Sequence, residues 1–240
     1  MTFHDPLSQY ERGIILAADV ETLDEVKRLV SICAEFEEVV AVKVGFSLAL
    51  RFGLKPVVDA VRSENRMPVI YDHQKAGTDI PAMGRPFAEV CREAGVNAVI
   101  LFPHAGPKTL EAFVSAALEA ELTPIVGLVM THPAYLRSEG GYIDDEAPDA
   151  ICRTALSLGV RNFVLPGTKS EILTRYARGP LAGVAETAIM MPGIGSQGAS
   201  VLTAFEAVAP RRRFAIIGSA IYAARDPRSA VDAFAKETRQ

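Results

Sequence analysis

The sequence is poor in cysteine and contains no tryptophan: among its 240 residues only Cys33, Cys91 and Cys152 carry a thiol. These cysteines are far apart, odd in number and form no CxxC motif, which is the pattern of reduced thiols in a reducing compartment. No apolar run approaches the roughly 20 residues of a membrane-spanning helix. The first residues carry acids and lack a hydrophobic signal core, so we expect no export. These absences predict a cytoplasmic protein that does not bind a membrane.

The sequence also lacks a surplus of positive charge. Lys and Arg total 25 against 29 Asp and Glu, a net charge of −4, which does not favour a nucleic-acid-binding protein. Apolar residues make up 49% and charged residues 22%, a composition typical of a globular domain. No linker, low-complexity tract or composition boundary divides the chain. We therefore predict a single domain spanning residues 1–240.

Short apolar, β-branched runs alternate with amphipathic stretches along the whole chain. Nearly continuous apolar runs are typical of strands that are buried on both faces of a parallel sheet. The predicted strands are 13–19, 39–45, 68–72, 97–102, 123–130, 162–167, 188–193 and 214–219. Helical patterns between them include 22–35, 81–94, 107–119, 148–158 and 227–237, and Asp226-Pro227 predicts an N-cap followed by a first-turn proline.

Eight strand-helix units in a chain of this length predict a (β/α)8 TIM barrel. A doubly wound sheet is the alternative, but no GxGxxG follows the first strand. The segment 131–147, after the fifth strand, is unusually long for a connecting loop. Because loops of this length in compact domains are often functional, we predict that it is a lid or a binding loop.

Charged residues concentrate at the carboxyl ends of the first three predicted strands. Active sites of such barrels lie at this end, so these residues are candidates for catalysis: Asp19, Lys43, Asp72, Lys75 and Asp79. Lysines interleaved with aspartates compensate one another's charge and suit proton transfer to a carbanion. An ordinary salt-bridge cluster that closes the mouth of the barrel fits the same residues.

Glycine-rich turns follow the seventh and eighth predicted strands, at residues 192–198 and 217–222. Backbone N–H groups at such turns favour a phosphate group, although glycine after a strand also serves turn geometry alone. The four histidines have no metal-binding spacing, so we predict no metal site. The basic run 211–213 predicts a solvated turn at the other end of the barrel.

Six motifs along nearly the whole chain resemble those of the orotidine 5′-phosphate decarboxylase family. They are LAADV, VKVGFSL, DHQKAGTDIP, MTHP, PGIGSQG and IGSAIY, in this order. The family's signature is an aspartate, a lysine and a second aspartate followed by isoleucine, and Asp72, Lys75, Asp79 and Ile80 supply these residue types.

The resemblance implies a cofactor-free conversion of orotidine 5′-monophosphate to UMP and CO2 in de novo pyrimidine biosynthesis. Lys75 would donate the proton to C6 of the pyrimidine, and Asp72 would lie beside the substrate carboxylate. Asp79 would reach in from the other subunit of a homodimer, so that two subunits share each active site. Lys43 would hold Asp72 and touch the ribose.

The resemblance also implies a set of substrate-binding residues. Asp19 would bind a ribose hydroxyl, Thr131 stands where the family has a serine on the pyrimidine, and Gln197 would bridge phosphate and base. The remaining residues of this set are Ile80, Pro192, Gly218 and Ser219.

The sequence departs from the family pattern at three places. His73 and Gln74 separate Asp72 from Lys75 where the family has one residue, which predicts a bulge or irregular loop there. Ser219 stands where the family has a phosphate-binding arginine, whose charge a serine does not replace, and Arg137 is a candidate substitute. Met83 stands where the family has a threonine.

Two other functions fit the sequence. One is a Mg²⁺-dependent decarboxylase of keto-sugar phosphates, or a hexulose-phosphate synthase, of the same superfamily. The other is a non-catalytic protein that binds a nucleotide phosphate. Dependence on magnesium would indicate the first, and UMP binding without turnover would indicate the second.

Overall fold

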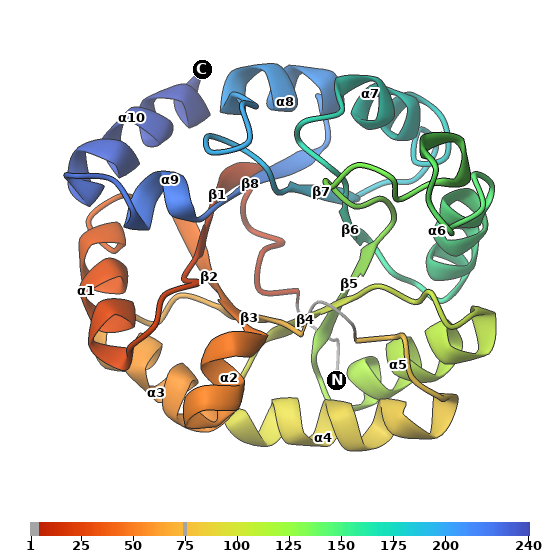
Figure 1. Ribbon diagram of the computed structural model, residues 1–240, viewed down its shortest axis with the longest axis horizontal. Helices are drawn as coiled ribbons and strands as arrows, with labels where there is room; N and C mark the ends of the chain where they lie inside the picture. The colour runs from red at the N-terminus through yellow and green to blue at the C-terminus, as the bar shows by residue number, and fades with distance from the viewer. Residues whose placement is uncertain (1–4, 74–75) are drawn as a thin grey trace.

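The computed structural model describes residues 5–73 and 76–240, and within them eight parallel strands close into a barrel (Figure 1). Each strand pairs with the next along the chain, and β1 pairs with β8 to close the ring. This architecture confirms the predicted single-barrel fold class. The strands are β1 (Arg12–Ala17), β2 (Val39–Gly45), β3 (Val69–Asp72), β4 (Ala98–Leu101), β5 (Thr123–Gly127), β6 (Asn162–Val164), β7 (Ala188–Met191) and β8 (Arg212–Ile217).

Helices surround the barrel on its outside (Figure 1). They are α1 (Leu23–Cys33), α2 (Phe46–Phe52), α3 (Leu54–Glu64), α4 (Gly84–Ala94), α5 (Pro107–Glu119), α6 (Ala147–Ser157), α7 (Ser170–Arg178), α8 (Val201–Val208), α9 (Ser219–Tyr222) and α10 (Pro227–Arg239). Two 3-10 turns, η1 (Pro81–Met83) and η2 (Arg137–Glu139), precede α4 and α6. The predicted N-cap is confirmed, because the Asp226 carboxylate accepts hydrogen bonds from the N–H groups of Arg228 and Ser229 at the start of α10. None of the helices in the described part of the chain is long and apolar enough to span a membrane.

The barrel buries both faces of its strands, which explains their nearly continuous apolar sequences. One apolar cluster fills the interior of the barrel, and a larger one lies between the strands and the helices. Leu7, from the segment before β1, joins the interior cluster and is fully buried. Asp5 lies beside it and accepts hydrogen bonds from Asn162 Nδ2 at 3.3 Å and from Arg212 Nη2 at 3.0 Å. The segment before β1 therefore seals the end of the barrel where the strands begin.

Several strands end earlier than the apolar runs predict. Residues 128–130 after β5, 165–167 after β6 and 192–193 after β7 leave the sheet, although their sequences continue the apolar pattern. Most of these residues stay buried because they pack over the carboxyl end of the barrel. The pattern of hydrophobicity reports burial, so it does not mark where backbone pairing stops.

The prediction of a solvated turn at residues 211–213 is wrong. Arg212 and Arg213 belong to β8, and Arg212 is buried against Asp5. Arg211 donates hydrogen bonds to the carbonyl oxygens of Ala177 and Val184. These guanidinium groups satisfy buried oxygens at the amino end of the barrel, a role that local sequence does not indicate.

The segment 131–147 is a folded loop held to its neighbours by side chains. The buried Tyr135 hydroxyl lies 2.8 Å from His104 Nε2, in the loop after β4, and donates to the Leu128 carbonyl oxygen at 3.3 Å. Lys169, in the loop after β6, pairs with Glu139 at 2.6 Å. The loop thus spans the β4, β5 and β6 ends of the barrel, and its movement as a lid stays a prediction.

Candidate active site

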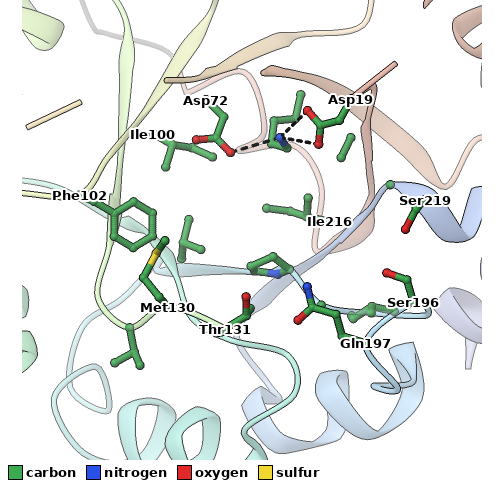
Figure 2. Close-up of a pocket in the computed structure, with 18 of the residues that line it drawn as sticks. Asp19, Asp72, Ile100, Phe102, Met130, Thr131, Ser196, Gln197, Ile216 and Ser219 are labelled. Atoms are coloured by element: carbon green, nitrogen blue, oxygen red, sulfur yellow. Dashed lines mark hydrogen bonds and ion pairs between the residues drawn. The ribbon is translucent and has the colours of Figure 1, made fainter. Parts of the chain in front are cut away.

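A cavity of about 290 Å³ opens at the carboxyl ends of the strands. It draws residues from most of the strand ends, which is where a barrel of this kind holds its active site. The lining residues are Ala17, Asp19, Lys43, Asp72, Ile100, Phe102, Val129, Met130, Thr131, Val164, Pro192, Gly193, Ile194, Ser196, Gln197, Ile216, Gly218, Ser219 and Tyr222. Figure 2 shows the charged residues on one side of this cavity and Ser196, Gln197 and Ser219 on another.

Lys43 lies between two carboxylates at the ends of β1 and β3. Its Nζ atom is 3.2 Å from Asp72 Oδ2, 3.2 Å from Asp19 Oδ2 and 3.3 Å from Asp19 Oδ1 (Figure 2). The Lys43 side chain is only 6% exposed. Burial alone would lower the pKa of Lys43, but the two neighbouring carboxylates outweigh burial and raise it. Lys43 therefore stays charged and holds both carboxylates in place.

Gly45 makes room for this arrangement at the end of β2. A Cβ atom on Gly45 would lie 2.5 Å from Asp19 Oδ1, closer than non-bonded atoms approach. The absence of a side chain at residue 45 thus lets the Asp19 carboxylate turn toward Lys43. The VKVG sequence of β2 supplies both the ammonium group and the space beside it.

An apolar wall faces the charged residues. Phe102 and Met130 lie beside each other on this side of the cavity, with Ile100 next to Asp72 (Figure 2). The Phe102 ring lies directly over Gly127, where any Cβ atom would overlap it. A wall of this kind excludes water and strengthens electrostatic interactions inside the cavity.

Neutral polar groups lie on the side formed by the loops after β5, β7 and β8. Gln197 Oε1 lies near Gly193, at 3.1 Å from the position of a Cβ atom on that glycine, and Thr131 Cγ2 is 3.5 Å from the same position. Gly193 has a φ of +92°, which favours glycine. The amide of Gln197 and the hydroxyl of Thr131 are thereby brought to one part of the cavity.

The structure brings most of the predicted site residues together. Those that line the cavity are Asp19, Lys43, Asp72, Thr131, Pro192, Gln197, Gly218 and Ser219. Lys75, the predicted proton donor, lies outside the described residues, as does Gln74. Arg137 does not line the cavity: its guanidinium group is mostly exposed and lies 4.0 Å from Asp144. Within residues 5–73 and 76–240, no group of three or more His, Cys, Asp or Glu side chains is placed to hold a metal ion.

Asp79 and Ile80 lie in a different place from the other predicted residues. Asp79 lines a second, open groove, together with Leu50, Met83 and Val90, which we call the Asp79 groove. Thr109 holds this segment by donating a hydrogen bond to the Asp79 carbonyl oxygen at 2.8 Å. In a single chain these two residues are therefore not part of the cavity.

His73, the residue after β3, turns away from the cavity. Its Nδ1 atom lies 2.6 Å from the Tyr71 hydroxyl, and its ring packs edge-on against Phe87. Asp72 between them faces the cavity, so the alternation of a strand continues through His73. The rest of the predicted bulge falls on Gln74, outside the described residues.

Several lining residues were not predicted from the sequence. Tyr222 lies three residues after Ser219, one helical turn along α9, and its ring lies against Gly218. That helical spacing is a signal from which it could have been found. Ser196 stands beside Gln197 in the same glycine-rich loop, whereas Phe102 and Met130 have the sequence signature of core residues and gave no signal.

Comparisons with known proteins place this chain in a family. The family model described as "Orotidine 5′-phosphate decarboxylase / HUMPS family" matches residues 12–234. The chain belongs to the orotidine 5′-phosphate decarboxylase / HUMPS family. Among curated relatives of this family, the orotidine 5′-phosphate decarboxylase of Methanosarcina barkeri is 33% identical over 224 residues, 93% of each chain. That of Pyrococcus furiosus is 30% identical over 229 residues, 95% of this chain and 98% of the relative.

Solved structures of the orotidine 5′-phosphate decarboxylase / HUMPS family share this fold. The orotidine 5′-phosphate decarboxylase of Pyrococcus horikoshii is 26% identical, with a TM-score of 0.78 over 95% of this chain and all of that chain. The enzyme of Methanocaldococcus jannaschii, complexed with the inhibitor BMP, has a TM-score of 0.82 at 23% identity and covers 95% of this chain and 99% of that chain. Because the Methanocaldococcus jannaschii enzyme is only 23% identical to this chain, the similarity between the two concerns the fold alone. The family predicted from the sequence is confirmed.

Proposed function

We propose that this protein is a carboxy-lyase that converts orotidine 5′-monophosphate to UMP and CO2 in de novo pyrimidine biosynthesis. The observation that carries the proposal is the buried Lys43 ammonium between Asp19 and Asp72, at the base of a cavity in a barrel of this family. The relatives described above all bear the name of this decarboxylase and match along nearly the full chain, which bears out the function predicted from the sequence.

The decarboxylation requires charged side chains that are already in position before the bond between C6 of the pyrimidine and the carboxylate breaks. The bond between C6 of the pyrimidine and the carboxylate breaks, CO2 leaves, and the electron pair stays on C6. Lys75 then gives a proton to C6 and regains one from solvent. Asp72, fixed by Lys43, lies beside the substrate carboxylate and destabilises it relative to neutral CO2. A preorganised ammonium stabilises the developing carbanion in a cavity that excludes water, and no metal or cofactor takes part.

The remaining cavity residues hold the substrate. Asp19 binds a ribose hydroxyl, and Thr131 bonds the pyrimidine. Gln197 bridges base and phosphate, which the proximity of its amide to Thr131 supports. Pro192 and Gly218 shape the backbone that surrounds the ligand. Binding energy from the phosphate, far from the reacting bond, helps to pay for ordering the site.

The active enzyme is a homodimer in which Asp79 and Ile80 complete the partner's cavity. Two observations support this assembly: Asp79 lies outside its own cavity, and the surface around it is apolar. Ile80 is 63% exposed, and Leu50, Met83 and Val90 are also exposed large hydrophobic residues. Leu50, Met83 and Val90 line the Asp79 groove, and Ile80 follows Asp79 in the chain; exposed apolar groups that gather in this way favour a protein interface.

Mixing two inactive variants tests the shared site. Lys75→Ala and Asp79→Ala are each expected to lose activity, whereas heterodimers contain one intact site with Lys75 from one subunit and Asp79 from the other. A co-expressed mixture is expected to recover about a quarter of the activity of the unaltered enzyme, because about half of random dimers are mixed and each has one intact site of two. Dimers that recover nothing, or a fully active monomer in sedimentation, would overturn the proposed assembly.

The loss of ultraviolet absorbance of orotidine 5′-monophosphate tests the activity directly. We expect turnover by the purified protein that EDTA does not change and that Lys75→Ala abolishes. Lys55→Ala, a change at an exposed lysine of α3, is the matched control and should keep full activity. Turnover of keto-sugar phosphates that requires Mg²⁺ would replace the proposal with the superfamily alternative, and UMP binding without turnover would replace it with a binding protein. The cytoplasmic location stays a prediction.

A further inference from the structure

Asp79 and Ile80 present exposed side chains from a stretch of backbone that α5 holds in place. The Asp79 carbonyl oxygen accepts a hydrogen bond from the Thr109 hydroxyl of α5 at 2.8 Å. At the start of α4, Gly84 lies so close to α5 that a Cβ atom on it would be 2.9 Å from the Ala112 carbonyl oxygen. Contacts with α5 therefore fix the chain on both sides of Ile80.

The Thr109 hydroxyl makes this hydrogen bond from a buried position in the first turn of α5, where only 3% of the residue is exposed. A threonine inside a helix commonly bonds a carbonyl oxygen three or four residues earlier in the same helix. Thr109 is the third residue of α5, so the residues at those positions precede the helix, and its hydroxyl donates to Asp79 instead. Since a buried hydroxyl without a partner is costly, the bond holds the Asp79 peptide against α5.

The residues shortly before Asp79 are held by other contacts. The Ala76 carbonyl oxygen accepts a hydrogen bond from the Phe102 N–H group at 2.7 Å. Gly77 has a φ of +88°, and a Cβ atom on it would be 3.2 Å from the backbone of the loop after β4. Loss of the Thr109 hydrogen bond should therefore release Asp79 while Ala76 and Gly77 stay in place.

We propose that Thr109 is a positioning residue, which fixes the peptide of Asp79 so that the Asp79 carboxylate enters the partner's cavity in one orientation. This inference rests on the proposed function, because it takes Asp79 to complete the site of the other subunit. Thr109 lines neither the cavity nor the Asp79 groove, so its effect on the reaction passes through Asp79. A reacting group on an ordered backbone is in place before the substrate arrives, which lowers the barrier to reaction.

Mixed dimers separate this positioning role from a general effect on the fold. Each mixed dimer of Lys75→Ala and Asp79→Ala subunits has one intact site, whose Asp79 comes from the Lys75→Ala subunit. Thr109→Val, which removes the hydroxyl and keeps the shape, is expected to lower the recovered kcat about tenfold when it is placed in that subunit, since a small misplacement of a reacting group is costly. The same change in the Asp79→Ala subunit, which has no carboxylate to position, should leave the recovered activity unchanged.

Two further variants serve as controls in the Lys75→Ala subunit. Thr109→Ser keeps the hydroxyl and is expected to restore the recovered activity. Thr238→Val is the matched control, because Thr238 is 2% exposed and its hydroxyl donates to the Phe234 carbonyl oxygen at 2.9 Å within α10. It removes the same kind of buried hydrogen bond far along the chain from Asp79 and should leave the recovered activity unchanged.

Equal losses from Thr109→Val in the two placements, or no loss in either, would overturn the positioning role. Amide exchange across residues 79–84 gives a readout that does not depend on turnover. We expect faster exchange in Thr109→Val and not in Thr109→Ser, and unchanged exchange in Thr109→Val would overturn the anchor even in an active enzyme. If Lys75→Ala and Asp79→Ala together recover nothing, the proposed shared site fails, whereas faster exchange in Thr109→Val would still uphold the anchoring of Asp79 by Thr109.

Discussion

A single buried ammonium organises the charged side of the cavity. Lys43 contacts Asp19 and Asp72 at 3.2 Å, and its folded-state pKa is raised above the ordinary value of 10.5 because the carboxylates outweigh the effect of burial. A raised lysine pKa contributes stability that is complete below the unfolded-state pKa and is lost as the pH rises through the folded-state pKa. Near neutral pH the full contribution of Lys43 is therefore present.

Replacing Lys43 with methionine is expected to leave Asp72, whose side chain is only 14% exposed, without this cation. Loss of one partner of a buried ion pair costs on the order of 3 kcal/mol in unfolding free energy at pH 7. Urea denaturation at pH 7 checks this, with Lys55→Met at an exposed lysine as the control. A loss no larger than that of Lys55→Met would contradict the explanation.

A methyl group at residue 45 should damage the site more than the fold. In Gly45→Ala the added Cβ atom displaces the Asp19 carboxylate from Lys43, because the two atoms would otherwise be 2.5 Å apart. We expect kcat/KM to fall about tenfold or more, since a small misplacement of a binding group is costly, while unfolding free energy changes by less than about 1 kcal/mol. Steady-state kinetics and thermal unfolding provide the two measurements. Gly183→Ala is the matched control because no atom lies within 4 Å of its Cβ position.

At the scale of elements, the long connection between β5 and α6 is an ordered loop that specific contacts hold in place. Leu136 and Ile143 pair across it, and Tyr135 and Glu139 hold it to the loops after β4 and β6. Its first residue, Thr131, lines the cavity. The position of Thr131 therefore depends on contacts made by the rest of the loop.

Removing the Tyr135 hydroxyl tests this dependence. In Tyr135→Phe the hydrogen bonds to His104 and to the Leu128 carbonyl oxygen are lost, which costs about 1 kcal/mol locally and leaves a buried carbonyl with one bond fewer. We expect faster amide exchange across residues 131–147 and a raised KM, with kcat changed less. Tyr142→Phe, in the same loop but 100% exposed, should change neither quantity. Unaltered exchange in Tyr135→Phe would show that other contacts hold the loop.

At the scale of the whole molecule, the barrel was predictable because its strands are buried on both faces. The charged residues of the site were predictable for a related reason: parallel strands all end at one rim, so polar residues at strand ends converge whatever their distance in sequence. The placement of Asp79 in a separate groove follows from the path of the chain across the end of β4, which no local pattern encodes. The buried arginines of β8 were missed because their acceptors, such as Asp5, are about two hundred positions away.

The seal at the amino end of the barrel is expected to stabilise the entire fold. Leu7→Ala would open a cavity in the interior cluster and cost about 2–5 kcal/mol in unfolding free energy, whereas Leu7→Met keeps the volume and should cost less than about 1.5 kcal/mol. Denaturant unfolding measures both. Equal, small losses in the two variants would mean that the segment before β1 contributes no packing energy.

The pairing of β1 with β8 also sets the order in which the molecule can be made. One edge of β1 gains its backbone partner only after Ile217 has been synthesised, and Arg239 near the end of the chain pairs with Glu38 just before β2. Until then a nascent chain carries an open sheet with two unpaired edges, the state most exposed to wrong association. Protein that is cut short before β8 should consequently be a substrate for chaperones and proteases, and complete chains are the first that can close.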